Sequence, residues 1–315
     1  MVENVIIIGG GPAGLAAAIY NARAGLKPIV FAGSPPGGQL TLTTEVENYP
    51  GFESILGPDL VSRMRKHAEK FGVRFVDQNV VKVDFTKRPF SIYLPSSSKT
   101  EGEDEGYRSR SVIVATGAKA LWLGLESEKR LRGKGVSACA TCDGFFFKER
   151  TVAVVGGGDT ALEEALTMTK FAKKVYLIHR RNEFRASKIM QERVFGNSKI
   201  EVIFNAEVEE ILGEMKVEGL KLKVKDSEQK VGIRNIKIDG VFIAIGHKPD
   251  TDIFIDKVEL DQKGYIVVKD FMTSVPGVFA AGDCIDHKYR QATTAVGMGV
   301  SAALETERWL EGNQG

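Results

Sequence analysis

Short apolar runs alternate with helical segments along this chain, and the pattern predicts an α/β protein. Residues 5–8 form a β-branched run that is typical of a strand buried on both faces. A glycine-rich turn follows, and residues 13–24 are rich in Ala and Leu, which indicates a helix that ends at Gly25. Residues 28–31 predict the next strand, so the chain opens with a β–α–β unit.

The same pattern returns in the middle of the chain. Residues 151–155 predict a strand, residues 160–172 a helix and residues 175–178 the following strand. Each unit also has a distant apolar strand that ends in glycine, at residues 111–117 and 240–246. We interpret this as an internal duplication that gives two Rossmann-like dinucleotide-binding domains in one chain.

A third apolar segment indicates how the two domains are connected. Residues 278–283 predict a strand that ends in Gly-Asp, and residues 293–310 predict a long helix rich in small residues. Because this segment has no evident place in the second domain, we expect it to complete the first. The second domain, 119–247, is then inserted into the first, 1–118 and 248–315. The two connecting segments would let one domain rotate against the other.

Composition and charge narrow the class of protein. The chain has 315 residues, of which 43% are hydrophobic and 27% charged, as in ordinary soluble proteins. Its net charge of +2 does not favour nucleic-acid binding. The N-terminus lacks a secretory signal and no apolar run approaches the ~20 residues of a membrane span, so we expect a cytoplasmic protein. The polar residues 95–110 predict a solvated hairpin loop.

Both glycine-rich turns carry a dinucleotide-binding fingerprint. In the first, Gly9 permits the tight turn, Gly11 lets the backbone approach a phosphate, and Gly14 lets helix and strand pack closely. The N–H groups and the dipole of the following helix attract a pyrophosphate. Gly156 and Gly158 stand in the same register in the second turn, which favours two nucleotide sites over two merely glycine-rich turns.

The residues beyond each turn predict different nucleotides. The strand after the second turn ends at His179-Arg180-Arg181, where an NAD-dependent protein usually has an acidic residue for the ribose. Arginine suits a 2′-phosphate instead, and Arg185 lies close enough to join, so we expect NADPH. The alternative is a solvated basic surface. The first site has no acidic residue at the matching position, and Ser34 is a candidate for its ribose contact.

Cys139 and Cys142 have the spacing of a redox-active dithiol. Zinc would need two more ligands, and neither Cys284 nor the four histidines repeat a metal-ligand spacing, so we expect no metal. An inert reduced pair is the other alternative. Asp143, directly after the pair, could exchange a proton with a thiol or could simply cap a turn with Gly144.

Taken together, these motifs resemble the small, bacterial-type thioredoxin reductases over nearly the full length. The matching segments include residues 9–14, 37–40, 44–51, 115–118, 139–144, 156–161, 179–186, 246–247, 282–283 and 290–292. A Cys-x-x-Cys between two nucleotide folds is the hallmark of that family. The chain departs from it at residues 123–126, where Leu-Gly-Leu-Glu stands in one interdomain linker, and in the longer polar stretch at 96–106.

The resemblance implies FAD in the first domain, NADPH in the second, a homodimer, and thioredoxin as the protein substrate. It makes Cys142 the flavin-side thiol, Cys139 the thiol that attacks thioredoxin, and Asp143 the proton donor. Expected contacts to FAD are Gly9, Gly11, Pro12, Ala13, Gly14, Gly38, Gln39, Asn48, Asp283, Arg290, Gln291 and Ala292. Expected contacts to NADPH are Gly156, Gly158, Thr160, His179, Arg180, Arg181 and Arg185.

Two other functions fit the same motifs. The first is the same disulfide chemistry on another protein, such as a glutaredoxin-like or peroxiredoxin-linked partner. The second is a nucleotide-binding redox sensor without turnover. The double fingerprint fits a sensor, but the Cys-Asp arrangement favours catalysis. A third possibility, oxidation of NADPH by oxygen, would leave the cysteines idle.

Overall fold

The computed structural model describes all residues except 1, 43–44, 96–105, 226–229 and 314–315. The chain folds into two compact units, Met1–Lys119 with Lys248–Gly315, and Ala120–His247. The second unit is thus inserted into the first, in agreement with the predicted fold class. A short sheet of β9 (Ala118–Ala120) and β18 (His247–Pro249) forms where the chain passes between them.

The first unit is built on a mixed sheet with the order β5–β2–β1–β8–β7–β6, in which β19 also pairs with β8. Its strands and helices are β1 (Val2–Ile8), α1 (Pro12–Arg23), β2 (Ile29–Phe31), η1 (Gln39–Leu42), β3 (Glu45–Val46), β4 (Ile55–Leu56), α2 (Gly57–Lys70), β5 (Arg74–Val76), β6 (Lys82–Asp84), β7 (Phe90–Tyr93), β8 (Tyr107–Val114), η3 (Asp252–Phe254), β19 (Val278–Ala280), η4 (Gly282–Cys284) and α7 (Ala292–Gly312).

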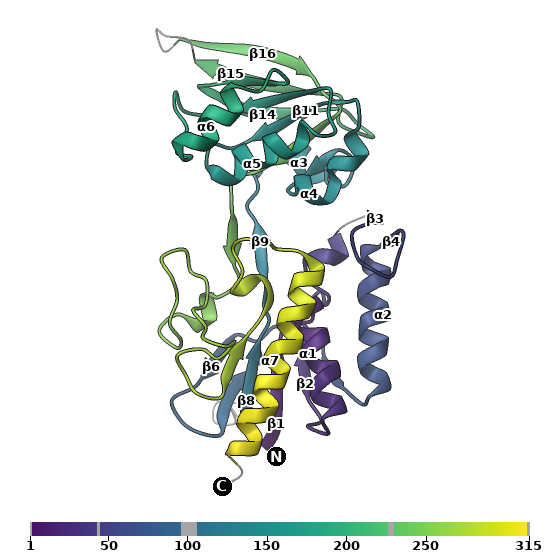
Figure 1. Cartoon of the computed structure of the whole chain (residues 1–315), viewed down its shortest axis with the longest axis vertical. Helices are drawn as coiled ribbons and strands as arrows, with labels where there is room; N and C mark the ends of the chain where they lie inside the picture. Colours follow the sequence, from purple (N-terminus) through teal and green to yellow (C-terminus); the bar gives the residue numbers. More distant parts are fainter. Residues whose placement is uncertain (1, 43–44, 96–105, 226–229, 314–315) are drawn as a thin grey trace. The chain divides into compact units, whose positions relative to one another are not determined.

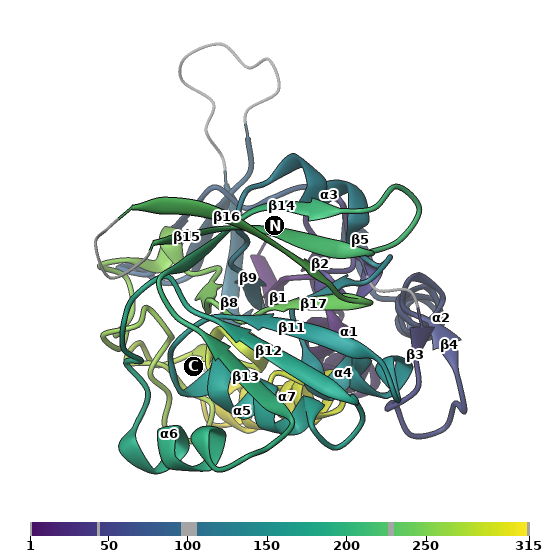
Figure 2. The ribbon, with the colours of Figure 1, turned by 90° about the horizontal axis from the view of Figure 1, so that it is seen from above.

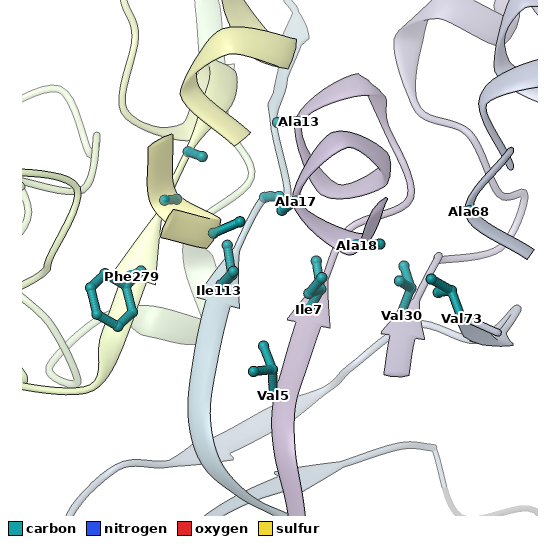
Figure 3. Packing of buried hydrophobic residues seen from close by; sticks show 14 of the residues in the cluster. Val5, Ile7, Ala13, Ala17, Ala18, Val30, Ala68, Val73, Ile113 and Phe279 are labelled. Carbon is teal, nitrogen blue, oxygen red and sulfur yellow. The ribbon is translucent and has the colours of Figure 1, made fainter. Parts of the chain in front are cut away.

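The parallel strands of this sheet bury one β-branched side chain after another. Ile7 is in register with Val30 on one side and with Ile113 on the other, and all three are fully buried. Figure 3 shows these side chains beneath the helix that carries Ala17 and Ala18. Because both faces of the strands are covered, the run reads as continuously apolar in sequence.

Helix α7 packs along α1, and small residues allow the close approach (Figure 1). A side chain at Gly299 would overlap the carbonyl oxygen of Ala13. One helical turn or more away, the buried Asn21 side chain donates to the carbonyl oxygen of Ala303 at 3.1 Å. These contacts confirm that the C-terminal helix completes the first unit.

The second unit repeats the parallel arrangement with the strand order β10–β17–β11–β12–β13. Figure 2 labels β17, β11, β12 and β13 of this sheet. A separate antiparallel sheet has the order β14–β15–β16. The elements are α3 (Glu126–Leu131), β10 (Val136–Ser137), α4 (Ala140–Asp143), η2 (Gly144–Phe147), β11 (Thr151–Val155), α5 (Asp159–Met168), β12 (Lys174–Ile178), α6 (Lys188–Phe195), β13 (Ile200–Ile203), β14 (Ala206–Leu212), β15 (Gly219–Lys225), β16 (Val231–Lys237) and β17 (Gly240–Ile243).

Several predicted boundaries were wrong. The strand expected over 278–283 ends at Ala280, and Gly282 begins η4. The helix expected over residues 160–172 ends at Met168, and the Lys199 ammonium donates to the carbonyl oxygens of Thr169 and Ala172 in the turns that follow, at 2.8 and 3.1 Å. The loop expected over 95–110 includes the start of β8, since Tyr107–Val114 pairs with β1 and β7. Residues 96–105 of that expected loop lie outside the described residues.

Within the described residues, no helix is both long and apolar enough to cross a membrane.

Candidate active site

The first glycine turn joins β1 to α1, and its glycines have distinct structural duties. Gly9 has a φ of +122°, and a side chain there would overlap the carbonyl oxygen of Ala115. A side chain at Gly14 would overlap the carbonyl oxygen of Gly9. Gly11, by contrast, has no atom within 4 Å of the position that a Cβ would take, so its face of the turn is open. The turn is therefore closed on the protein side and accessible on the other.

The helix that follows this turn offers uncapped backbone donors. Gly11 is the N-cap of α1 and supplies no side-chain hydrogen bond, and Pro12 stands in the first turn. The backbone N–H groups at the start of α1 therefore have no side-chain cap, which leaves them available to an anion. The buried hydroxyl of Thr116, next to Gly9, also has no hydrogen-bond partner among the described residues.

Segments distant in sequence converge on the same turn. Gly38 lies against Gly11, since a Cβ at Gly38 would be 3.5 Å from the Gly11 Cα. Gly282, at the start of η4, lies against Ala13, where a Cβ would be 2.8 Å from the Ala13 side chain. The structure thus brings three of the predicted cofactor segments to the N-terminus of α1.

Asn48 and Gln291 form a further link between distant segments. The Asn48 amide donates to the Gln291 side-chain oxygen at 3.2 Å. Gln291 is the N-cap of α7 and forms a capping box with Thr294. The exposed Asn48 loop is therefore attached to the first turn of the C-terminal helix.

Asp283 is a largely buried carboxyl group in η4. Burial and, secondarily, the charge of Asp286 raise the pKa of Asp283 to about 6, although Arg290 opposes the shift. Asp286 itself accepts the backbone N–H groups of Lys288 and Tyr289 at 2.7 and 2.9 Å. It also accepts that of Arg290 at 3.0 Å, so one side chain shapes the whole segment that leads into α7.

A cavity of about 210 Å³ extends from the first turn. Its lining includes Gly10, Ala32 and Gly37, together with Val61 and Arg65 of α2. No carboxylate of the described residues lines it, which agrees with the lack of an acidic residue after β2. Ser34, the sequence candidate for a ribose contact, is not part of the lining, and its backbone N–H is bound to Asn79 at 3.0 Å.

The second glycine turn joins β11 to α5 and has the same design. A Cβ at Gly156 would lie 2.5 Å from that of Ala161, and Gly158 has open space around it. Gly158 is the N-cap of α5 without a side-chain cap, and Thr160 is half-buried in the first helical turn. This turn also presents an open face and uncapped donors.

A buried histidine supports the second turn. The ring of His179 lies against Gly157, where a Cβ would be 2.6 Å from Nε2 and would overlap the rest of the ring. Burial lowers the pKa of His179, and the charges of the neighbouring arginines add to the effect. The shift favours the neutral imidazole, and the expected contact of His179 with NADPH stays a prediction. Arg180 and Arg181, just after β12, and Arg185 are exposed.

Cys139 and Cys142 form a disulfide in the second unit. Cys139 is the N-cap of α4, and its sulfur accepts the backbone N–H of Cys142 at 3.2 Å. The backbone N–H of Cys139 in turn donates to the Ser137 hydroxyl at 3.1 Å. Both cysteines keep some solvent exposure within this unit.

Asp143 follows the disulfide in α4. Burial raises the pKa of Asp143, and a hydrogen bond from Ser137 partly opposes the shift. The group therefore holds a proton at a higher pH than an ordinary aspartic acid. Next to it, Phe145 and Phe146 are 60% and 42% exposed, which is unusual for side chains of this size.

Cys284 stands apart from this chemistry. It is fully buried, and burial raises the pKa of its thiol to about 11, so it is an unreactive packed cysteine. Among the residues that the structure describes, no group of His, Cys, Asp and Glu side chains is arranged to hold a metal ion.

A sequence profile of the pyridine nucleotide-disulphide oxidoreductases matches residues 3–299. The chain belongs to this family.

Curated relatives and solved structures agree with the assignment. The chain is 52% identical to a thioredoxin reductase of Rickettsia conorii, over 98% of each sequence. It is 49% identical to one of Streptomyces coelicolor, over 98% of this chain and 94% of that protein. The solved thioredoxin reductase of Giardia duodenalis matches with a TM-score of 0.91 and 42% identity, over 99% of this chain and 100% of its own. That of Streptococcus pyogenes has a TM-score of 0.90 and 39% identity, over 99% of both.

In this oxidoreductase each unit gathers its own set of predicted residues. Gly9, Gly11, Ala13, Gly14, Gly38 and Gly282-Asp283 converge in the first unit, and Asn48 joins Gln291 there. The second unit gathers the other glycines, the arginine segment and the disulfide. Gln39 is exposed at the start of η1, and its expected role stays a prediction.

Sequence reasoning missed several residues that shape the sites. Thr116 follows β8 in a segment noted only for its family resemblance, and Arg65 in α2 and Ser137 in β10 lie outside the motifs found. Periodicity could have found α2, whose buried residues Leu60, Val61, Met64 and Ala68 follow helical spacing.

Proposed function

We propose that this chain is an NADPH-dependent flavoprotein that reduces the disulfide of thioredoxin through Cys139 and Cys142. The observation that carries the proposal is the partly exposed disulfide, which lies in the unit that also contains the second glycine turn. Membership of the pyridine nucleotide-disulphide oxidoreductases supports this chemistry. The relatives named thioredoxin reductase, at about 50% identity over nearly the whole chain, support the substrate.

We assign the FAD domain to residues 1–118 and 248–315. The open face at Gly11, the uncapped N–H groups of α1 and the unpartnered Thr116 hydroxyl, as far as the described residues go, fit a pyrophosphate and its attached groups. Asp283 and the Asn48–Gln291 pair provide polar groups for the rest of the cofactor. Pro12, Gly38, Gln39, Arg290 and Ala292 complete the proposed contacts.

We assign the NADPH domain to residues 119–247. The open Gly158 and the N-terminus of α5 fit the pyrophosphate, and Arg180, Arg181 and Arg185 fit a 2′-phosphate. The neutral His179 supports the turn beneath. When bound, the two cofactors would supply hydride transfer and the two electrons that reduction of a disulfide needs.

The disulfide cysteines then exchange with the substrate. Two electrons and two protons convert the pair to the thiols of Cys139 and Cys142. The Cys139 thiolate attacks one sulfur of the thioredoxin disulfide, so that bond breaks and the other sulfur leaves as a thiolate. Cys142 then attacks the Cys139 sulfur, re-forms the Cys139–Cys142 bond and releases the second thioredoxin thiol. The N–H of Cys142, 3.2 Å from the Cys139 sulfur, favours a negative charge there.

Asp143 supplies the proton that the leaving thiolate needs. Its raised pKa keeps a fraction of the group protonated nearer to neutral pH. The exposed Phe145 and Phe146 provide apolar contact area for a protein substrate beside the disulfide. We further propose a cytoplasmic location, because a reducing compartment suits an exchangeable cysteine pair. A homodimer is proposed on the family resemblance alone.

The test combines three measurements on the purified protein. We expect the visible absorbance of flavin, NADPH-dependent reduction of thioredoxin, and a stable mixed disulfide between Cys139 and thioredoxin in Cys142→Ser. Cys139→Ser should form no such adduct. Cys284→Ser is the matched control and should turn over normally, because Cys284 is buried away from the pair.

Normal turnover by Cys142→Ser would refute the mechanism. Turnover with another disulfide protein, but not with thioredoxin, would retain the chemistry and change the substrate. Bound flavin without NADPH-driven thiol production would indicate a redox sensor instead.

A further inference from the structure

The segment that carries the exposed arginines is fastened to the second glycine turn. The backbone N–H of Arg185 donates to the carbonyl oxygen of Gly157 at 2.8 Å. On the opposite side, the backbone N–H of Asn205 donates to the carbonyl oxygen of Arg181 at 3.1 Å. The segment is therefore held between the turn and the end of β13.

A pair of hydrogen bonds to one oxygen atom adds a further attachment, beside the buried side chains of Phe184 and Ala186. Oδ1 of Asp159 accepts the backbone N–H of Ser187 at 2.9 Å and the Ser187 hydroxyl at 2.8 Å. Asp159 is the first residue of α5, and Ser187 lies two residues after Arg185. The N-terminus of α5 and the arginine segment thus share one anchoring point.

The use of the Ser187 hydroxyl is informative. Ser187 is the N-cap of α6, a position where a serine side chain usually accepts an N–H of its own helix. Here it makes no such cap and donates to Asp159 instead. The hydroxyl therefore joins the two segments at the expense of local helix capping.

We propose that Asp159 is a positioning residue that, through Ser187, sets the preference for a nucleotide with a 2′-phosphate. This inference rests on the proposed function, since it assumes that Arg180, Arg181 and Arg185 hold that phosphate. A dinucleotide would contact the turn with its pyrophosphate and the arginines with its 2′-phosphate. Its affinity then depends on the spacing between the two, which the Asp159–Ser187 hydrogen bonds fix.

The charge of Asp159 has the wrong sign for a direct role. A carboxylate beside a phosphate-binding turn repels the ligand, so its hydrogen bonds must supply the benefit. A favourable interaction with the dipole of α5 is the alternative. That interaction would stabilise the helix without regard to which nucleotide is bound.

The experiment measures binding of NADP⁺ and of NAD⁺ by calorimetry in the flavin-loaded protein, together with KM and kcat for NADPH. In Asp159→Ala we expect about tenfold weaker binding of NADP⁺, as two hydrogen bonds are lost, and NAD⁺ binding within about twofold of wild type. Ser187→Ala, which keeps the backbone donor, should weaken NADP⁺ binding by about threefold. KM for NADPH should rise in parallel while kcat stays within about twofold.

Three further variants separate position from charge. Asp159→Asn retains the acceptor oxygen without the charge, so it should retain the preference for NADP⁺. Ser187→Thr retains the hydroxyl and should behave like wild type. Glu163→Ala removes an exposed acid from the same helix that has no part in these hydrogen bonds, and should change neither affinity.

The outcomes separate an error in the positioning role of Asp159 from an error in the assignment of NADPH. A wild-type preference for NADP⁺ that persists in Asp159→Ala would overturn the positioning role alone. Equal loss in Asp159→Asn and Asp159→Ala would assign the effect to charge and also overturn it. A wild-type protein that binds NAD⁺ as well as NADP⁺ would overturn both this role and the assignment of NADPH.

Discussion

Alanine substitutions at two glycines of the first turn should separate folding from cofactor binding. A Cβ at Gly14 would overlap the carbonyl oxygen of Gly9 and lie 3.0 Å from its carbonyl carbon. Neither backbone group can move without separating α1 from β1, so Gly14→Ala should cost about 3 kcal/mol of unfolding free energy, the upper range for overpacking. This loss should be present with or without flavin.

Gly11→Ala should behave in the opposite way. Gly11 has φ −80° and ψ −176°, which alanine adopts freely, and no atom lies within 4 Å of its Cβ position. The flavin-free protein should therefore keep its stability or gain about 0.4–1 kcal/mol from the stiffer unfolded chain. The added methyl group would occupy the open face, where we expect it to weaken FAD binding by about 10- to 100-fold through lost backbone hydrogen bonds.

Urea unfolding with and without added FAD measures both effects. A 10- to 100-fold rise in Kd removes about 1.4–2.8 kcal/mol of the stabilisation that excess FAD provides. Relative to wild type, Gly11→Ala should thus lose stability only when FAD is present. If it destabilised the flavin-free protein as much as Gly14→Ala does, or bound FAD like wild type, the open face would not be the pyrophosphate site.

Buried carboxyl groups give three more predictions. Asp143→Asn cannot donate a proton, so thioredoxin reduction should slow by about 100-fold. We expect the wild-type rate to fall as pH rises through the raised pKa of Asp143, and the variant to lack this fall. An unchanged pH–rate profile would exclude the role. Asp283, with a pKa raised to about 6, adds stability below its unfolded pKa and loses it as pH rises through about 6. Asp283→Asn should flatten that dependence in the flavin-free protein, by at most about 3 kcal/mol between pH 4 and 7 in chemical unfolding. Glu128 is fully buried and accepts the N–H groups of Leu123 and Gly124 at 2.8 and 3.0 Å. Glu128→Ala should therefore lower the unfolding free energy by about 3–5 kcal/mol. Glu126→Ala, at an exposed position of the same helix, should leave it almost unchanged in the same assay.

The local pattern of the sequence predicted the parallel strands and both glycine turns because each is determined within a few residues. The run before Gly9 is β-branched, and the spacing of Gly9, Gly11 and Gly14 matches strand-to-helix packing that the structure confirms. The disulfide between Cys139 and Cys142 also follows from a short spacing. These features need no knowledge of the rest of the chain.

Features that depend on distant partners could not be predicted in this way. The turns that follow α5 are bound by Lys199, some thirty residues away, and no local pattern predicts that contact. Most residues of the antiparallel strands β14, β15 and β16 are exposed or half-buried, so the sequence shows no clear pattern of apolar residues there. The hydrogen bonds from Ser187 to Asp159 join segments 28 residues apart, and no sequence motif predicts them.

The two glycine turns differ in a way that suits their proposed ligands. The first turn is enclosed by its own unit: Gly282 of η4 and Gly299 of α7 both pack on Ala13, and Gly38 lies beside Gly11. The proposed FAD contacts come from several segments of the first unit, so we expect FAD to be released slowly. The second turn faces exposed arginine side chains on a segment that is held by hydrogen bonds to Gly157 and Asp159 and by the buried side chains of Phe184 and Ala186. A nucleotide there can leave without disturbing the core. The proposed reaction needs a flavin that stays bound and a nicotinamide nucleotide that exchanges in every cycle. The two glycine turns are alike, so the residues around each turn suit it to its proposed ligand.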